Sequence, residues 1–182
     1  MKENKWAKLS INLKENNMSK DKISYTSLET PFEKDLSVIP FSEYPRPAMK
    51  RDSYISLNGY WNLKVLSNKK ELFSGKILVP FVPESKLSGI CQRFPLNSRL
   101  IYSRSFTLPQ GFVKKRVILN FGAVDRHATV KINGLNVCEN DGGYLPFSVD
   151  ITEALSEGEN LIEVECFDDL DTDYPYGKQC KN

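Results

Sequence analysis

The sequence has few of the residues that mark several large classes of protein. Its 182 residues include four cysteines and one histidine, and the cysteines, at positions 91, 138, 166 and 180, lie far apart. A zinc site needs ligands that pair closely in sequence, so this spacing argues against the common zinc patterns. No apolar run approaches the roughly 18 residues that cross a bilayer. We therefore predict no metal site and no membrane partner.

The common signatures of nucleotide binding and hydrolysis are also missing. There is no Gly-x-Gly-x-x-Gly, no Walker loop, no Gly-x-Ser-x-Gly and no His-Glu-x-x-His. The single histidine, His127, begins an alternating apolar run, and this position is more typical of a surface or hydrogen-bonded strand residue than of a catalytic base. The sequence predicts no catalytic residue and no cofactor in this chain.

The charges are nearly balanced overall but are segregated along the chain. The net charge is +2, yet residues 53–148 carry 13 basic and 5 acidic side chains, whereas residues 149–182 carry 2 and 10. We expect the basic middle to fold against the acidic end. The scattered Lys and Arg residues, with no basic helix, predict no nucleic-acid partner.

Cellular location is predicted from the N-terminus and the cysteines. The first residues lack the apolar stretch of an export signal. Cys138 and Cys166 lie in alternating apolar runs, where cysteine behaves as a small buried hydrophobe. Reduced thiols without an export signal predict a cytoplasmic protein.

From Ser53 onwards, apolar residues recur with a period of two, which is the pattern of half-buried strands. The Asn133-Gly134 pair between two such runs predicts a type I′ hairpin turn. A single helical turn is expected from Thr152, as its cap, to Ser156. Because no long helix connects the runs, the sequence predicts an all-β fold, an antiparallel β-sandwich. The expected strands cover residues 60–65, 76–79, 99–106, 117–121, 128–132, 136–138, 147–151 and 162–166.

The chain divides into two parts by composition. Residues 1–43 are polar and show no sustained period, so we predict an extended or flexible leader. Residues 44–182 are predicted to form the sandwich domain. After its last strand an acidic run begins with Asp168 and includes Asp171; such carboxylates can accept hydrogen bonds from sugar hydroxyls or ligate cations, or can lie in a solvated loop.

A series of short motifs lies in unbroken order across residues 44–180. The motifs are Tyr44-Pro45-Arg46-Pro47, Leu57-Asn58-Gly59-x-Trp61, Val79-Pro80-Phe81-Val82-Pro83-Glu84-Ser85, Tyr102-x-Arg104-x-Phe106, Phe121-Gly122-Ala123-Val124-Asp125, Val130-x-Ile132-Asn133-Gly134, Gly142-Gly143-Tyr144-x-Pro146-Phe147 and Gly177-Lys178-Gln179. In this order they resemble the N-terminal sugar-binding domain of glycoside hydrolase family 2. The resemblance implies a jelly-roll sandwich similar to galactose-binding domains, in agreement with the strand pattern.

The resemblance also implies partners. Family members of the β-galactosidase and β-glucuronidase type append an immunoglobulin-like domain and a barrel that holds both catalytic glutamates. This chain is therefore expected to be truncated before those domains, to be inactive alone, and to bind a β-galactoside- or β-glucuronide-like carbohydrate. By family position, Asp171 matches an aspartate that reaches the barrel's sugar site, and Asp168 is the second candidate.

Two other readings of the sequence stay open. A free-standing, lectin-like carbohydrate-binding module would need an exposed aromatic platform, for which Tyr174 and Tyr176 are the candidates. An inactive fragment could act as an interaction surface.

For local structure, we expect Arg104 to pair with an acidic residue such as Asp125 or Glu84, and Tyr144 to pack beside the Gly142-Gly143 turn.

Overall fold

The computed structural model describes residues 39–44, 48 and 51–168, and in these residues all regular structure is β-strand or short 3-10 helix. The first half contains β1 (Gly59–Ser67), β2 (Lys70–Val79), η4 (Lys86–Ser88), β3 (Arg99–Thr107) and β4 (Ile118–Phe121). The second half contains β5 (His127–Ile132), β6 (Leu135–Asp141), β7 (Phe147–Asp150), η5 (Thr152–Ala154) and β8 (Glu159–Phe167).

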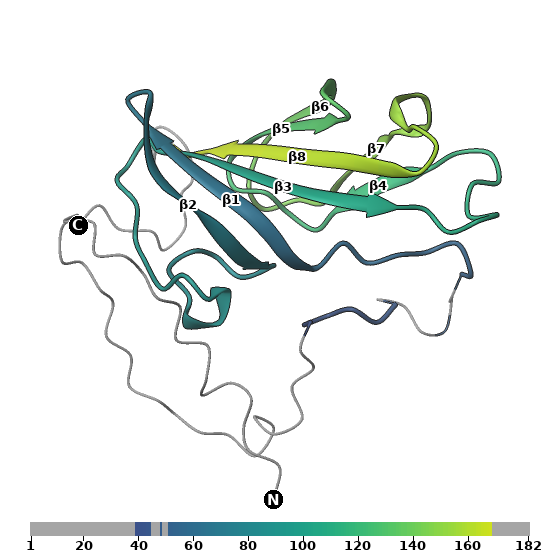
Figure 1. Cartoon of the computed structure of the whole chain (residues 1–182), viewed down its shortest axis with the longest axis horizontal. Helices are drawn as coiled ribbons and strands as arrows, with labels where there is room; N and C mark the ends of the chain where they lie inside the picture. Colours follow the sequence, from purple (N-terminus) through teal and green to yellow (C-terminus); the bar gives the residue numbers. More distant parts are fainter. Residues whose placement is uncertain (1–38, 45–47, 49–50, 169–182) are drawn as a thin grey trace, which may run out of the picture.

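The strands form two antiparallel sheets (Figure 1). The larger sheet has the order β2-β1-β3-β8-β5-β6, and the smaller sheet pairs β4 with β7. Every pairing is antiparallel, including the central contact of β8 with both β3 and β5. The predicted all-β sandwich is thus confirmed, and β8 lies near the middle of the larger sheet.

The core lies between the two sheets because alternate residues of the strands face the same side. In β1 the burial alternates from residue to residue, and in β5 Ala128, Val130 and Ile132 face inward. Each such fully buried aliphatic side chain contributes about 1.5–3 kcal/mol. The buried cluster comprises Trp61, Leu63, Val65, Ile77, Phe106, Val117, Leu119, Val130, Ile132, Ile151, Ile162 and Val164.

The hairpin between β5 and β6 has the predicted turn. Asn133 and Gly134 have φ angles of 50° and 82°. Positive φ at both central positions is what a type I′ turn requires, and it matches the twist of the flanking strands.

Two local predictions need correction. β2 begins at Lys70, six residues before the predicted strand, because residues 70–75 pair with the end of β1 despite their polar composition. Thr152 does not cap η5; it is the first residue of that turn. Its hydroxyl instead accepts from the Val117 N–H at 2.9 Å and donates to Asp150 at 2.5 Å. The hydroxyl bond to Asp150, a second bond from the Thr152 N–H at 3.0 Å and the bond from the Arg116 side chain lower the pKa of Asp150 to about 2.

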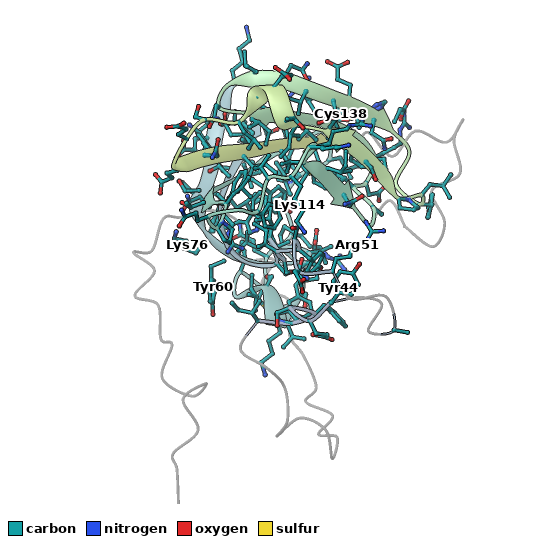
Figure 2. All side chains as sticks on the ribbon, turned by 90° about the vertical axis from the view of Figure 1, so that its right-hand side faces the viewer. Tyr44, Arg51, Tyr60, Lys76, Lys114 and Cys138 are labelled. Carbon is teal, nitrogen blue, oxygen red and sulfur yellow. The ribbon has the colours of Figure 1, made fainter. Side chains whose placement is uncertain are left out.

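The segment before β1 contacts the sandwich. The Asn58 side-chain amide donates to the carbonyls of Pro40 and Phe41, each at 3.2 Å. The rings of Tyr44 and Tyr54 meet edge to face, with centroids 4.7 Å apart. In Figure 2, Tyr44 lies below the strand layers, on the side opposite Cys138 of β6. The predicted boundary between leader and domain at residue 43 stays a prediction, since most of the leader lies outside the described residues.

Candidate functional site at the end of strand β8

β8 ends at Phe167, and at this end of the larger sheet the polar residues gather. The register places His127 of β5 opposite both Phe167 and Asp141, and it places Arg99 of β3 on the other side of Phe167. The loops before β5 and after β6 also belong to this end. The fold therefore brings together residues from four strands, β3, β5, β6 and β8, at this end.

Arg126, His127 and Asp141 form a chain of polar contacts at this end. The Arg126 Nη2 lies 2.8 Å from the His127 Nε2, and the His127 Nδ1 lies 3.2 Å from an Asp141 carboxylate oxygen. A guanidinium only donates, so Nε2 accepts, and the neutral imidazole carries its proton on Nδ1 and donates it to Asp141. Both ring nitrogens are therefore engaged, which supports the prediction that His127 is a strand residue and not a base.

The rest of this end is held by ring and charge contacts. The His127 ring stacks on Phe167 with centroids 6.2 Å apart, and the Arg99 guanidinium lies 5.3 Å from the Phe167 ring. Arg99 also forms an ion pair with Glu165. Arg126 is the most enclosed of the charged groups, with 12% of its side chain exposed, and its Nε lies 3.5 Å from Asp141.

The loop after β6 packs closely on Asp125. A Cβ atom at Gly143 would lie 2.1 Å from an Asp125 carboxylate oxygen, so only glycine fits there. Gly142 has a φ of 124°, as a turn that favours glycine requires. Tyr144 does not pack beside this turn as predicted, since it is 64% exposed and Leu145 is 76% exposed. The close approach of Gly143 to Asp125 turns the following residues outward.

Cys166 belongs to β8 and lies on the inner face of the larger sheet. Burial raises its pKa to about 12, and Asp125, Glu165 and Asp168 add to the effect. Burial likewise raises the pKa of Tyr102 above its ordinary value, with smaller contributions from Cys166 and Glu84. Both groups are protonated at neutral pH, so Cys166 is not a thiolate nucleophile. This agrees with the predicted role of Cys166 as a small structural residue.

Of the two predicted sugar-binding aspartates, the structure describes only Asp168. Asp168 directly follows β8 at this polar end and is partly buried. Asp171, Tyr174 and Tyr176 lie outside the described residues. Both aspartates stay predictions as sugar ligands, and the structure adds the neighbours of Asp168 that sequence reasoning missed, above all the Arg126 to Asp141 chain.

Arg104 has a different partner from the one expected. Its Nη1 donates to the Leu57 carbonyl at 2.6 Å and to the Asn58 carbonyl at 2.8 Å. Burial lowers its pKa. In these contacts Arg104 binds backbone carbonyls and not the predicted acidic side chain. It therefore ties the segment that leads into β1 to strand β3.

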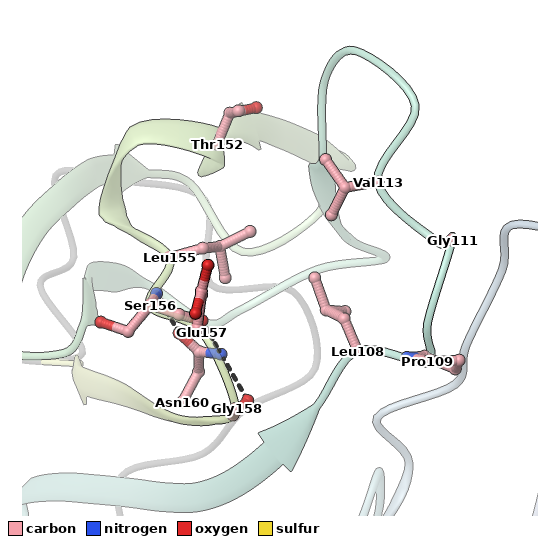
Figure 3. A pocket seen from close by; sticks show the side chains of 10 residues that line it. All are labelled: Leu108, Pro109, Gly111, Val113, Thr152, Leu155, Ser156, Glu157, Gly158 and Asn160. Carbon is pink, nitrogen blue, oxygen red and sulfur yellow. Dashed lines mark hydrogen bonds between the residues drawn. The ribbon is translucent and has the colours of Figure 1, made fainter.

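A second candidate, a cavity of about 320 Å³, lies at the opposite end of β8 (Figure 3). The side chains of Leu108, Val113 and Leu155 give it an apolar lining, and Glu157 provides a carboxylate. Its Asn160 is only 1% exposed. The Asn160 amide donates to the Ser156 and Gly158 carbonyls, both at 3.1 Å, and accepts from the Ser156 N–H at 2.7 Å. Asn160 thus serves the loop and is not displayed to a ligand.

Among the residues that the structure describes, no three His, Cys, Asp or Glu side chains are grouped so that they could hold a metal ion. None of the helices in this part of the chain is long and apolar enough to span a membrane.

Comparison with known proteins relates part of the domain to a known family. Residues 90–175 match the family described as "Glycosyl hydrolases family 2, sugar binding domain". Over these residues the chain is similar to a family 2 sugar-binding domain. The match covers β3 to β8 and continues past Asp168, so it includes the polar end of β8.

The relatives of this chain include β-glucuronidases that are much longer than the chain itself. The β-glucuronidase of Felis catus is 32% identical over 134 residues, which cover 63% of this chain and 20% of that protein. The β-glucuronidase structure from Faecalibacterium prausnitzii superposes with a TM-score of 0.52 at 29% identity, covering 62% of this chain and 20% of that one. The β-D-mannosidase structure from Dictyoglomus thermophilum gives 0.51 at 25% identity, covering 61% and 15%. The chain spans about a fifth of the length of the curated relatives it matches.

Proposed function

We propose that this chain is the non-catalytic sugar-binding domain of a β-glucuronidase-type family 2 glycosidase. The observation that carries the proposal is the family match, which runs through the polar end of β8. The described part of the chain adds chemical support, because His127 is engaged at both ring nitrogens and Cys166 is a neutral thiol. Its role is to present polar groups to carbohydrate, and hydrolysis belongs to the barrel of the complete enzyme.

The sugar we propose is a β-glucuronide, in place of the broader expectation that included β-galactosides. The similarity to β-glucuronidases from a mammal and a bacterium supports this choice. The fold by itself does not select the sugar, since a β-D-mannosidase structure is similarly close. Asp168 and Asp171 are the proposed ligands for sugar hydroxyls, because ionised carboxylates accept such hydrogen bonds strongly.

A domain exchange tests this function. The N-terminal domain of the Faecalibacterium prausnitzii β-glucuronidase is replaced by residues 44–182 of this chain, and hydrolysis of a nitrophenyl β-glucuronide is measured. We expect the chimera to hydrolyse the glucuronide and the isolated chain to be inactive. A chimera that folds, as judged by gel filtration and circular dichroism, yet has lost hydrolysis would contradict the proposal.

A free-standing carbohydrate-binding module is the second candidate, and one observation favours it. Tyr144 is 64% exposed in the loop after β6, as an aromatic platform for a sugar ring would be. Binding of the isolated chain to glucuronate- and galactose-containing polysaccharides, measured by affinity electrophoresis, separates the two functions. Retardation abolished by Tyr144→Ala, but not by Tyr60→Ala at another exposed tyrosine, would favour the free-standing module.

A further inference from the structure

The Asn133-Gly134 turn has a side chain that is held unusually firmly for an exposed hairpin residue. The Asn133 Nδ2 donates to the Asn160 Oδ1 at 2.8 Å and to the Ala154 carbonyl at 2.9 Å. Its Oδ1 accepts the N–H of Leu161 at 2.9 Å. The amide of one hairpin therefore joins η5 and the start of β8, which lie more than 20 residues further along the chain.

The partner of this amide is itself fixed. Asn160 is 1% exposed, and its own amide is bound to the backbone of Ser156 and Gly158. These contacts orient the Asn160 Oδ1 toward Asn133 before the hairpin bond forms. We call Asn133, Asn160 and the backbone groups that they bind the asparagine lock.

Asn133 is followed by Gly134, and an asparagine that precedes a glycine loses its side-chain amide more readily than any other asparagine. Because glycine has no Cβ, its backbone nitrogen can approach the preceding side chain closely. The Gly134 nitrogen attacks the Asn133 Cγ, a C–N bond forms, its proton passes to the departing amide nitrogen through water, and ammonia leaves. Water then opens the cyclic imide at either carbonyl, giving aspartate or isoaspartate. The only co-reactant is water.

We propose that Asn133 is a conditional deamidation site that the asparagine lock protects in the folded domain. To bring Cγ over the Gly134 nitrogen, the amide must rotate and give up its bonds to Asn160, Ala154 and Leu161. Conversion therefore requires the asparagine lock to open. The turn conformation alone does not supply this protection; these three distant partners do, together with the Ser156 Oγ, which lies 3.4 Å from the Asn133 Nδ2.

Conversion would make the opening permanent. A carboxylate at position 133 has no N–H to donate, so it would meet the Asn160 Oδ1 and the Ala154 carbonyl as acceptor against acceptor. The asparagine lock could not form again. Leu155 and Ser156, which line the cavity of Figure 3 together with Asn160, would then no longer be held in place by it. The modification site thus acts as a record of transient opening at this end.

Peptide mass spectrometry on the full chain tests the proposal, by following the conversion of amide to acid over days at mildly alkaline pH. Asn58-Gly59 is an internal reference, since Asn58 is held by two donated bonds of 3.2 Å. We expect conversion at Asn133 to be at least about tenfold slower in the native chain than in urea, because several hydrogen bonds must open. Equal rates at Asn133 in native and unfolded chains would overturn the proposal.

The variant Asn160→Ala tests the lock itself, with Asn160→Ser as a milder change if the first does not fold. We expect either folded variant to raise the rate at Asn133 by about tenfold, as for loss of one strong bond, and to leave the rate at Asn58 unchanged. A folded variant with an unchanged rate at Asn133 would show that the lock gives no protection. Equal acceleration at both sites would show general loosening and would likewise overturn the assignment.

Discussion

Cys166 makes the stability of this domain depend on alkaline pH. Its thiol lies behind Asp125, Glu165 and Asp168, and burial together with these carboxylates raises its pKa from 9.0 to about 12. The unfolded chain loses the thiol proton first as the pH rises. The stabilisation is therefore fully present below pH 9 and is lost as the pH rises toward 12.

The size of the effect follows from this pKa difference. At pH 10 an unfolded thiol with a pKa of 9.0 is mostly ionised, whereas the native one remains protonated. The linkage relation then gives a loss on the order of 1 kcal/mol between pH 7 and pH 10, and a loss of several kcal/mol once the pH reaches the pKa of the native thiol. Lysines and tyrosines also titrate here, so the effect must be measured as a difference.

The variant Cys166→Ala provides that difference. Urea unfolding followed by circular dichroism gives the free energy of unfolding of both proteins at pH 7, 8, 9 and 10. The comparison at pH 7 measures the lost packing alone. We expect the advantage of the wild type over the variant in the free energy of unfolding to shrink by on the order of 1 kcal/mol at pH 10. A difference that stays constant from pH 7 to pH 10 would refute the reasoning.

Three further changes are predicted to have distinct outcomes. Gly143→Ala should destabilise the domain by about 1–3 kcal/mol because its Cβ would overlap the Asp125 side chain, whereas Gly122→Ala, with open space around it, should be within about 0.5 kcal/mol of wild type in urea unfolding. Arg104→Met removes two hydrogen bonds from a charged donor to backbone carbonyls and should cost about 2–4 kcal/mol; a melting temperature equal to that of wild type would contradict this. Asp171→Ala should change the stability of the isolated chain by less than about 0.5 kcal/mol, yet lower kcat/KM of an active chimera by roughly tenfold to a hundredfold. The opposite pattern would make Asp171 a structural residue.

Sequence periodicity predicts most of the strands because burial on one face imposes a period of two. Val130 and Ile132 point inward as expected, and the Asn133-Gly134 turn has both positive φ angles. The first half of β2 escapes prediction because an edge strand needs little apolar character when its neighbour supplies the pairing.

The candidate site divides in the same way. The order of the motifs alone indicated the resemblance to the family whose model matches residues 90–175, and the acidic run alone made Asp168 a candidate, since residue types and spacing can be read without coordinates. Which side chains meet depends on register and loop packing between distant segments, as local sequence does not encode pairing across a sheet. Only the tertiary structure therefore placed Arg126 and His127 against Asp141, sent Arg104 to backbone carbonyls, turned Tyr144 outward, and joined Asn133 to Asn160 across 27 positions.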